Sequence, residues 1–174
     1  MMDYHKDYYK GINGIYFYRI LNKIIKMGNL RKRQVKILDF GCGVGKLKTL
    51  LGDKVINYDM LPDLSEIDDW KKAKFDVLVS NQVFHFFPEK ELKQFLDELY
   101  GINPDVELIV GIARANLLSE IAIFLTGERQ AHEGFEIESK KIFEVLKERM
   151  DLLKYTSVFQ MCDIYLMRFK QLNP

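Results

Sequence analysis

A glycine-rich turn directly after a short apolar run constrains this chain more than any other feature. The stretch ILDFGCGVGKL, residues 37–47, carries an acid at Asp39 and glycines at Gly41, Gly43 and Gly45. Because glycine has no Cβ, the backbone can pass close to a ligand where a strand gives way to a helix. The turn therefore predicts a ligand site at the carboxyl end of a buried strand.

Strand patterns and helix patterns alternate along the rest of the chain. The last two β-rich runs, 152–159 and 162–170, are joined too tightly for a crossover helix and predict an antiparallel hairpin. This order predicts an α/β fold: a doubly wound, mostly parallel sheet with helices on both faces, ending in that hairpin. The other predicted strands are 35–40, 54–59, 75–80 and 105–113, and the predicted helices are 14–28, 45–52, 88–101, 116–127 and 138–150.

Two common phosphate-binding motifs do not fit the turn. A P-loop would need glycine where Phe40 stands and a hydroxyl where Leu47 stands. The dinucleotide fingerprint would need its third glycine at Lys46. The turn is therefore not predicted to hold a pyrophosphate.

Two acids indicate a different ligand. Asp39 lies at the end of its strand, where a carboxylate repels phosphate and attracts an ammonium group. Asp59 ends the next strand, about twenty residues on, where its two oxygens can accept the hydroxyls of a ribose. The expected ligand is thus cationic at one end and a nucleoside at the other. The alternative is structural: a tight strand-to-helix turn with strand-end aspartates that form turns.

The segment ILDFGCGVG, followed by VINYDM, resembles the first two motifs of the class I S-adenosylmethionine-dependent methyltransferases. The resemblance covers residues 35–112, and the order of the later elements extends it to the hairpin. It implies a Rossmann-like fold, S-adenosyl-L-methionine as cofactor and S-adenosyl-L-homocysteine as product. No metal is required for such a transfer.

The same resemblance assigns cofactor contacts. Asp39 matches the acid near the amino group, Asp59 the ribose ligand, and Met60 the residue against adenine. The segment 60–75 is shorter than the helix and strand that the family usually has there, so we expect an abbreviated sheet edge, with Asp68 or Asp69 near the adenine amino group. The remaining contacts are the turn residues Gly41, Cys42, Gly43 and Gly45 and, mostly through backbone, Ser80, Asn81 and Gln82.

Two histidines are candidate catalytic residues. His132 lies in the polar loop beyond the fourth strand, the region that covers the acceptor in this family, and is the best candidate base where the acceptor must lose a proton. His85 matches a position where many small-molecule methyltransferases carry histidine. The alternatives are a surface residue for His132 and a core histidine bonded to a carbonyl for His85.

Two further segments have less specific patterns. The N-terminal tyrosines Tyr4, Tyr8 and Tyr9 are interpreted as an arm that closes over the cofactor, with a plain packing arm as the alternative. The apolar run 115–125 is interpreted as the wall of a pocket for a small, apolar or lipid-linked acceptor, with a core helix or a homodimer contact as the alternative.

Composition excludes several classes. The net charge of +1 gives no overall attraction to nucleic acid, and the Asn/Asp-Pro-Pro-aromatic motif of enzymes that methylate planar amino groups is absent, so neither a nucleic-acid nor a protein acceptor is expected. The two cysteines do not form a disulfide framework, and no apolar run is long enough to span a bilayer. We expect a cytoplasmic protein with a single domain over 1–174, comprising a helical arm at 1–28 and a core at 35–170.

The predicted function is methyl transfer by in-line displacement to a small acceptor. The first alternative is a cofactor-binding module or partner subunit without catalysis, and the second is a nucleotide-dependent oxidoreductase.

Overall fold

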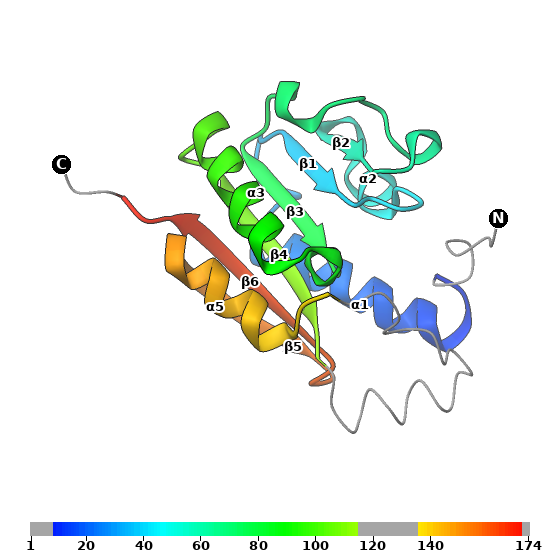
Figure 1. Cartoon of the computed structure of the whole chain (residues 1–174). Coiled ribbons are helices and arrows are strands. Elements are labelled where there is room, and N and C mark those ends of the chain that lie inside the picture. Colours follow the sequence, from blue (N-terminus) through cyan, green and yellow to red (C-terminus); the bar gives the residue numbers. More distant parts are fainter. Residues whose placement is uncertain (1–8, 115–135, 172–174) are drawn as a thin grey trace.

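The chain folds into one mixed sheet of six strands with helices on both faces (Figure 1). The structure is a computed structural model that describes residues 9–114 and 136–171. The strands are β1 Ile37–Phe40, β2 Val55–Tyr58, β3 Val77–Asn81, β4 Glu107–Ala113, β5 Met150–Val158 and β6 Cys162–Phe169.

The strand order is β2-β1-β3-β4-β6-β5. The first four strands in this order are parallel, and β6 is antiparallel to both β4 and β5. From β1 the chain moves outward to β2 and then returns to the other side of β1 to form β3. Ligands of open α/β sheets bind at such a switch point, beyond the carboxyl ends of the strands. The predicted doubly wound sheet and C-terminal hairpin are confirmed.

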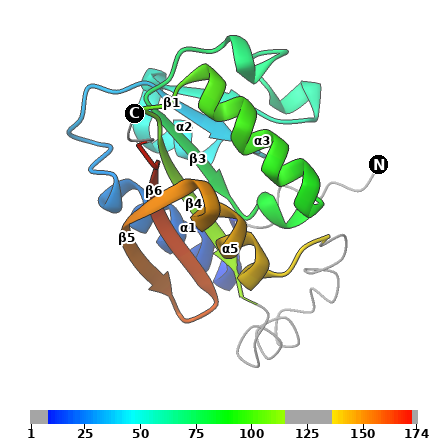
Figure 2. The ribbon, with the colours of Figure 1, turned by 60° about the vertical axis from the view of Figure 1, so that its left-hand side comes forward.

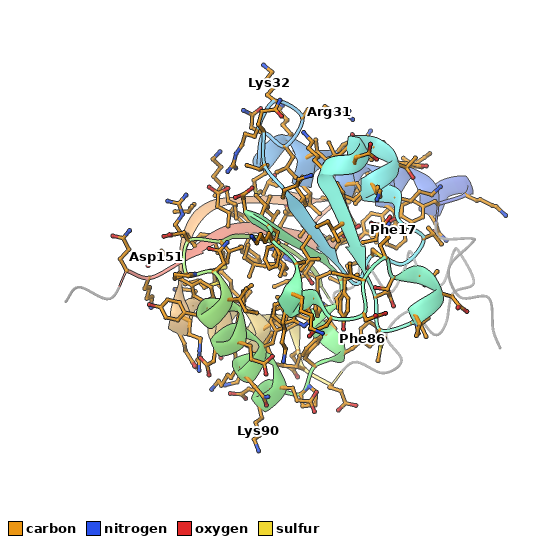
Figure 3. The ribbon with its side chains drawn as sticks, turned by 90° about the horizontal axis from the view of Figure 1, so that it is seen from above. Phe17, Arg31, Lys32, Phe86, Lys90 and Asp151 are labelled. Atoms are coloured by element: carbon orange, nitrogen blue, oxygen red, sulfur yellow. The ribbon has the colours of Figure 1, made fainter. Side chains whose placement is uncertain are left out.

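In the described part of the chain, two helices cover each face of the sheet. Helices α3 and α5 lie on one face and α1 and α2 on the other, as their separate hydrophobic cores show (Figure 2). Seen from above, Lys90 on α3 and Lys32, after α1, project on opposite sides of the sheet (Figure 3). Within the described ranges, every helix is too short or too polar to cross a bilayer. The helices are α1 Gly11–Met27, α2 Lys46–Leu51, α3 Glu89–Ile102 and α5 Ser139–Arg149.

Strand alternation decides which residues face which core. Ile37 and Val77 pack in the core under α1, whereas their neighbours Leu38 and Leu78 pack in the core under α3 and α5. Both faces of the central strands are therefore buried, which explains their apolar runs. Asp39, two residues after Ile37, shares the face covered by α1.

The segment between β2 and β3 contains no strand. It forms two short 3-10 turns, η2 Pro62–Leu64 and η3 Trp70–Lys72, so β2 is the edge of the sheet. The centroid of the buried Trp70 ring lies 5.7 Å from that of Phe40 and 5.0 Å from that of Phe95. These contacts anchor the short connection to the core under α3. The expected abbreviated edge is confirmed.

Helix α1 ends slightly differently from the prediction. The helix predicted over 14–28 spans Gly11–Met27, Gly28 follows it with a right-handed φ of −80°, and Asn29 takes the left-handed conformation at φ 51°. Gly28 is required for space instead, because a Cβ there would lie 2.6 Å from the side chain of Ile109. Helix α3 also runs one residue beyond Gly101, where it was expected to stop.

Candidate functional site

The glycine turn leads from β1 into α2 at the carboxyl edge of the parallel strands. Gly41, Gly43 and Gly45 all have positive φ, at 76°, 50° and 67°. A Cβ on Gly41 would lie 2.2 Å from Val83, and one on Gly45 would lie 2.7 Å from the amide of Asn57. Glycine is therefore required at these two positions both by conformation and by space.

The turn is hydrogen-bonded to the end of β2. The carbonyl of Tyr58 accepts the backbone N–H groups of Gly41 and Cys42 at 2.8 and 3.1 Å. One oxygen of Asp59 accepts the N–H of Gly43 at 3.0 Å, and the other accepts the N–H of Leu61 at 3.1 Å. Each carboxylate oxygen keeps a further lone pair for a ligand hydroxyl. Asp59 thus joins the loops after β1 and β2.

Asp39 is a buried carboxylate without a protein partner. It is 6% exposed, and no hydrogen bond joins its side chain to any residue within 9–114 or 136–171. Burial, and then the neighbouring carboxylate of Asp59, raise the pKa of Asp39 to about 7. A cation that entered this position would relieve both effects.

Two asparagines add unused acceptors on the same face. Asn57 lies opposite Asp39 in the parallel register, and Asn81 follows two residues after Val79, the other neighbour of Asp39. The Oδ1 atoms of both asparagines are buried and accept no hydrogen bond in the part of the chain that the structure describes. Buried polar atoms without a partner among the described residues therefore gather on this face, around the carboxylate of Asp39.

Tyr9 lies beside the same site. Its ring packs against Phe17 and Tyr18 at centroid distances of 5.7 and 5.4 Å, and the Nζ of Lys46 lies 5.6 Å from its centroid. Burial raises the pKa of the Tyr9 phenol, and the charge of Asp39 raises it further, which places Tyr9 and Asp39 in the same neighbourhood. Tyr4 and Tyr8 lie outside the described residues.

The residues expected around the nucleoside differ in exposure. Met60, after β2, is 87% exposed, so its apolar side chain is available to a ligand. Asp68 is exposed as well and forms no hydrogen bond to the other described residues. Asp69 instead caps η3 by accepting the N–H of Lys71 at 3.0 Å.

The segment after β3 is held mainly by structural contacts. Ser80 is fully buried, and its Oγ accepts or donates no hydrogen bond among the described residues. Gln82 has a positive φ of 60°, donates its backbone N–H to Gly111 at 2.8 Å and directs its side-chain amide to the hydroxyl of Tyr16 at 3.5 Å. The Gln82 side chain is thus turned toward α1, which leaves the backbone of this segment as the part that can contact a cofactor.

The structure describes one of the two candidate catalytic histidines, His85. His85 is 1% exposed in the short turn η4 Phe84–Phe86, with its Nδ1 3.4 Å from the carbonyl oxygen of Ile137. Its own carbonyl accepts the N–H of Glu136 at 2.8 Å. This geometry fits the alternative of a core histidine next to a carbonyl. His132 and the apolar run 115–125 lie outside the described residues.

Cys42 contributes packing rather than a reactive thiol. It is 9% exposed, and its S–H lies 3.4 Å from the carbonyl oxygen of Leu64. Burial, followed by the charges of Asp39 and Asp59, raises the pKa of this thiol to about 12. No group of three or more His, Cys, Asp or Glu side chains in the described ranges is arranged to hold a metal ion.

Three residues of the site did not stand out in the sequence. Asn57 interrupts an otherwise apolar strand, and this polar residue at an inward position was a usable signal. Val83 fixes the space at Gly41, and Tyr16 reaches Gln82 from α1. Neither of these two carries a local signal, because each acts through a neighbour that is distant in sequence.

Several solved structures share the fold of this chain at low sequence identity. No family profile matches its sequence. No curated protein matches it either. Among solved structures, the PH0226 protein of Pyrococcus horikoshii OT3 aligns at 18% identity with a TM-score of 0.67, over 98% of this chain and 97% of that one.

Two similar structures are methyltransferases that contain S-adenosylhomocysteine. The N-methyltransferase NodS of Bradyrhizobium japonicum WM9 aligns at 15% identity and a TM-score of 0.64, over 90% of this chain and 88% of that one. The magnesium protoporphyrin IX methyltransferase of Synechocystis PCC 6803 aligns at 18% identity and a TM-score of 0.57, over 87% of this chain and 81% of that one. The chain therefore has the Rossmann-like fold of the class I S-adenosylmethionine-dependent methyltransferases.

Proposed function

We propose that the protein is an S-adenosylmethionine-dependent methyltransferase that transfers a methyl group in line to a small acceptor. The observation that carries the proposal is Asp39 at the end of β1, a buried carboxylate that has no hydrogen-bond partner among the described residues. An unpaired buried carboxylate is costly to keep unless a ligand compensates it. A cationic amino acid part of a cofactor supplies that compensation.

The residues present fit the parts of this cofactor. Asp39, with the buried oxygens of Asn57 and Asn81 nearby, fits the ammonium group. Asp59 fits the ribose hydroxyls, because its oxygens already point into the loops on either side and retain acceptor capacity. Exposed Met60 fits one face of the adenine. The methyltransferases of similar fold that contain S-adenosylhomocysteine support the same assignment.

The chemistry needs little from the protein beyond position. When bound, S-adenosylmethionine supplies a methyl group that its sulfonium already activates. The glycine turn and Asp59 would fix the donor. Tyr9, whose phenol pKa is raised by the charge of Asp39, is proposed to close over the donor and limit the access of water. His132 is proposed as the base for an acceptor that must lose a proton.

The acceptor is proposed to be a small molecule, apolar or lipid-linked. Strand β4 ends at Ala113, at the same edge of the sheet as the cofactor residues, and the apolar run 115–125 comes next in the sequence. One protein of similar fold is named for magnesium protoporphyrin IX, a small-molecule acceptor. The near-neutral charge of the chain gives no support to a nucleic-acid acceptor.

Calorimetric titration with two nucleosides tests the cofactor assignment. S-adenosylhomocysteine carries the ammonium group, whereas 5′-methylthioadenosine has the same nucleoside without the amino acid. We expect Asp39→Asn to lower the affinity for S-adenosylhomocysteine by about tenfold or more and to leave the affinity for methylthioadenosine unchanged. Asp59→Asn should lower the affinity for both ligands. Equal loss of both ligands in Asp39→Asn would remove the ammonium role.

Two outcomes separate the proposal from its alternatives. If S-adenosylhomocysteine does not bind at millimolar concentration, or if NAD(P) raises the melting temperature and S-adenosylhomocysteine does not, the methyltransferase proposal is wrong. If S-adenosylhomocysteine does bind, methyl transfer is measured with methyl-labelled S-adenosylmethionine and a panel of small amine, hydroxyl and lipid-linked acceptors. Tight cofactor binding without transfer to any of them would favour a cofactor-binding module.

A further inference from the structure

Strand β5 forms an open edge of the sheet. It is the last strand in the order and pairs only with β6. Residues 151–155 are all exposed, and no residue in the described ranges hydrogen-bonds to the outer side of their backbone. A row of unpaired N–H and C=O groups of this kind is a template for another strand.

The exposed side chains on this edge are unusually apolar. Leu152 is 43% exposed, Leu153 47% and Tyr155 50%. Exposed edge strands are normally protected by charge, because apolar edges promote association. The two charged residues among them, Asp151 and Lys154, flank the leucines on either side. The sequence D-L-L-K is therefore self-complementary in charge when it is paired antiparallel with itself.

A β-bulge brings these two charges to one face of the sheet. Leu152 pairs with Met167 and Lys154 with Leu166, so Leu153 is an extra residue in β5. In a regular strand, positions 151 and 154 would face opposite sides, but the extra residue puts both on the side of α1. Lys154 does reach this side, since its Nζ donates to the carbonyl of Met27 at 3.2 Å.

We propose that two copies of this chain form a dimer by antiparallel pairing of their β5 strands, centred between Leu152 and Leu153. In this register Asp151 of each copy lies opposite Lys154 of the other, on the same face, which forms two equivalent ion pairs across the twofold axis. Leu152 and Leu153 meet at the centre and bury each other's exposed surface.

The Asp151 carboxylate and the Lys154 ammonium group can both accept a further partner, which supports this register. Asp151 forms no ion pair among the described residues, because Arg168, its neighbour on β6, is paired with Glu107 at 2.8 Å. Figure 3 shows Asp151 projecting away from the body of the molecule. The lysine ammonium of Lys154 keeps two further donors beyond its bond to Met27.

The dimer surface is separate from the proposed cofactor site. Strand β5 is at one end of the sheet, whereas Asp39 and Asp59 lie near the other end, after β1 and β2. The dimer therefore does not depend on the proposed function, and loss of one leaves the other intact.

Sedimentation velocity over a range of concentrations tests the pairing by charge reversal. We expect the native chain to dimerise, and Asp151→Lys and Lys154→Glu each to raise the dimer dissociation constant by about tenfold or more, because each creates two like-charge contacts. The double variant Asp151→Lys/Lys154→Glu restores opposite charges and regains dimerisation. Lys72→Glu, at an exposed lysine with 82% of its side chain accessible, is the matched control and leaves the dimer unchanged.

Further readouts keep the proposal falsifiable. Leu153→Lys places a charge at the centre of the interface and yields monomers, whose melting temperature equals that of the native chain at concentrations where both are monomeric. Titration with S-adenosylhomocysteine gives the same affinity in monomeric variants as in the native chain. A native chain that stays monomeric at hundreds of micromolar, or a double variant that does not recover, overturns the proposal.

Discussion

The backbone N–H of Gly43 donates a hydrogen bond of 3.0 Å to the carboxylate of Asp59, so the end of β2 fixes the glycine turn after β1. The second oxygen of Asp59 accepts the N–H of Leu61 at 3.1 Å. One side chain therefore holds two loops in place before any ligand binds. Such preorganisation lowers the ordering cost of binding.

Replacing Asp59 tests this bracing role through stability. Asp59→Ala leaves the N–H groups of Gly43 and Leu61 without their acceptor, and we expect the free energy of unfolding to fall by about 1–3 kcal/mol. Asp59→Asn keeps one acceptor oxygen, so its free energy of unfolding should fall by less. Urea unfolding measures both, and Asp63→Ala, at an exposed acid in the same connection, serves as the control with little change. An unchanged midpoint for Asp59→Ala would show that the two hydrogen bonds do not hold the loops.

Affinity for S-adenosylhomocysteine is expected to rise with pH. The pKa of Asp39 is raised to about 7, and an ammonium group favours the ionised carboxylate, so binding must release a proton at lower pH. We expect affinity to be about tenfold weaker at pH 6 than at pH 8. Calorimetry in buffers of different ionisation enthalpy measures the released proton directly. In Asp39→Asn the pH dependence disappears, and a native profile that is flat over this range contradicts the assignment.

Stability of the ligand-free chain should change in the opposite direction. The pKa of Asp39 rises on folding from 3.8 to about 7, so its contribution to stability is fully present below the lower value and is lost as pH rises through the upper one. Asp39→Asn stays neutral throughout. Its melting temperature should therefore rise relative to that of the native chain between about pH 4 and pH 8.

The sequence was enough to predict the sheet and the two acids of the candidate site, Asp39 and Asp59. Apolar runs predicted every observed strand, because the central strands are buried on both faces, and the acids at Asp39 and Asp59 follow two of those strands directly. The place of each acid at a strand end is a local property. Its position beside the glycine turn then follows from the parallel order of β2, β1 and β3.

Features that depend on distant neighbours were not predictable. Gln82 has a positive φ although it is not glycine, because its backbone bonds to Gly111 and its side chain reaches Tyr16 on α1. The left-handed residue after α1 is Asn29, since Gly28 is needed where Ile109 leaves no room for a Cβ. Each of these choices is made by packing between elements, which no local pattern records.

Gly41→Ala should be among the most destabilising changes near the turn. The residue has φ 76°, and a Cβ would lie 2.2 Å from Val83, so both backbone strain and a steric clash arise. We expect a loss of about 2–4 kcal/mol in the free energy of unfolding, measured in urea.

A matched glycine separates these two costs. Gly52, at φ 73° and ψ −154°, has nothing within 4 Å of a Cβ, so Gly52→Ala introduces backbone strain without a clash, at a cost of about 1–3 kcal/mol. Adding Val83→Ala to Gly41→Ala should recover the steric part, measured against Val83→Ala by itself. If Gly41→Ala costs as much in the Val83→Ala background as in the native chain, the contact with Val83 carries no cost.

The two thiols are expected to be unreactive in the folded chain. Burial raises the pKa of both Cys42 and Cys162 to about 12, so the reactive thiolate is scarce at neutral pH. A thiol-reactive disulfide reagent at pH 8 should label neither cysteine before unfolding and both after it. Cys42→Ala should keep its affinity for S-adenosylhomocysteine, since only the backbone of the turn is proposed to pass the ligand. Rapid labelling of Cys42 in the native chain would show that its surroundings open in solution.

His85 is expected to support the fold rather than the cofactor. Its buried ring lies 3.4 Å from the carbonyl of Ile137, and its own carbonyl accepts the N–H of Glu136, so it positions the segment that leads into α5. His85→Ala removes the ring and leaves a cavity beside that carbonyl, which should lower the free energy of unfolding by about 2 kcal/mol or more. Under native conditions its affinity for S-adenosylhomocysteine and for methylthioadenosine should equal that of the native chain. If the urea midpoint were unchanged while either affinity fell, His85 would act on ligand binding rather than on the stability of the fold.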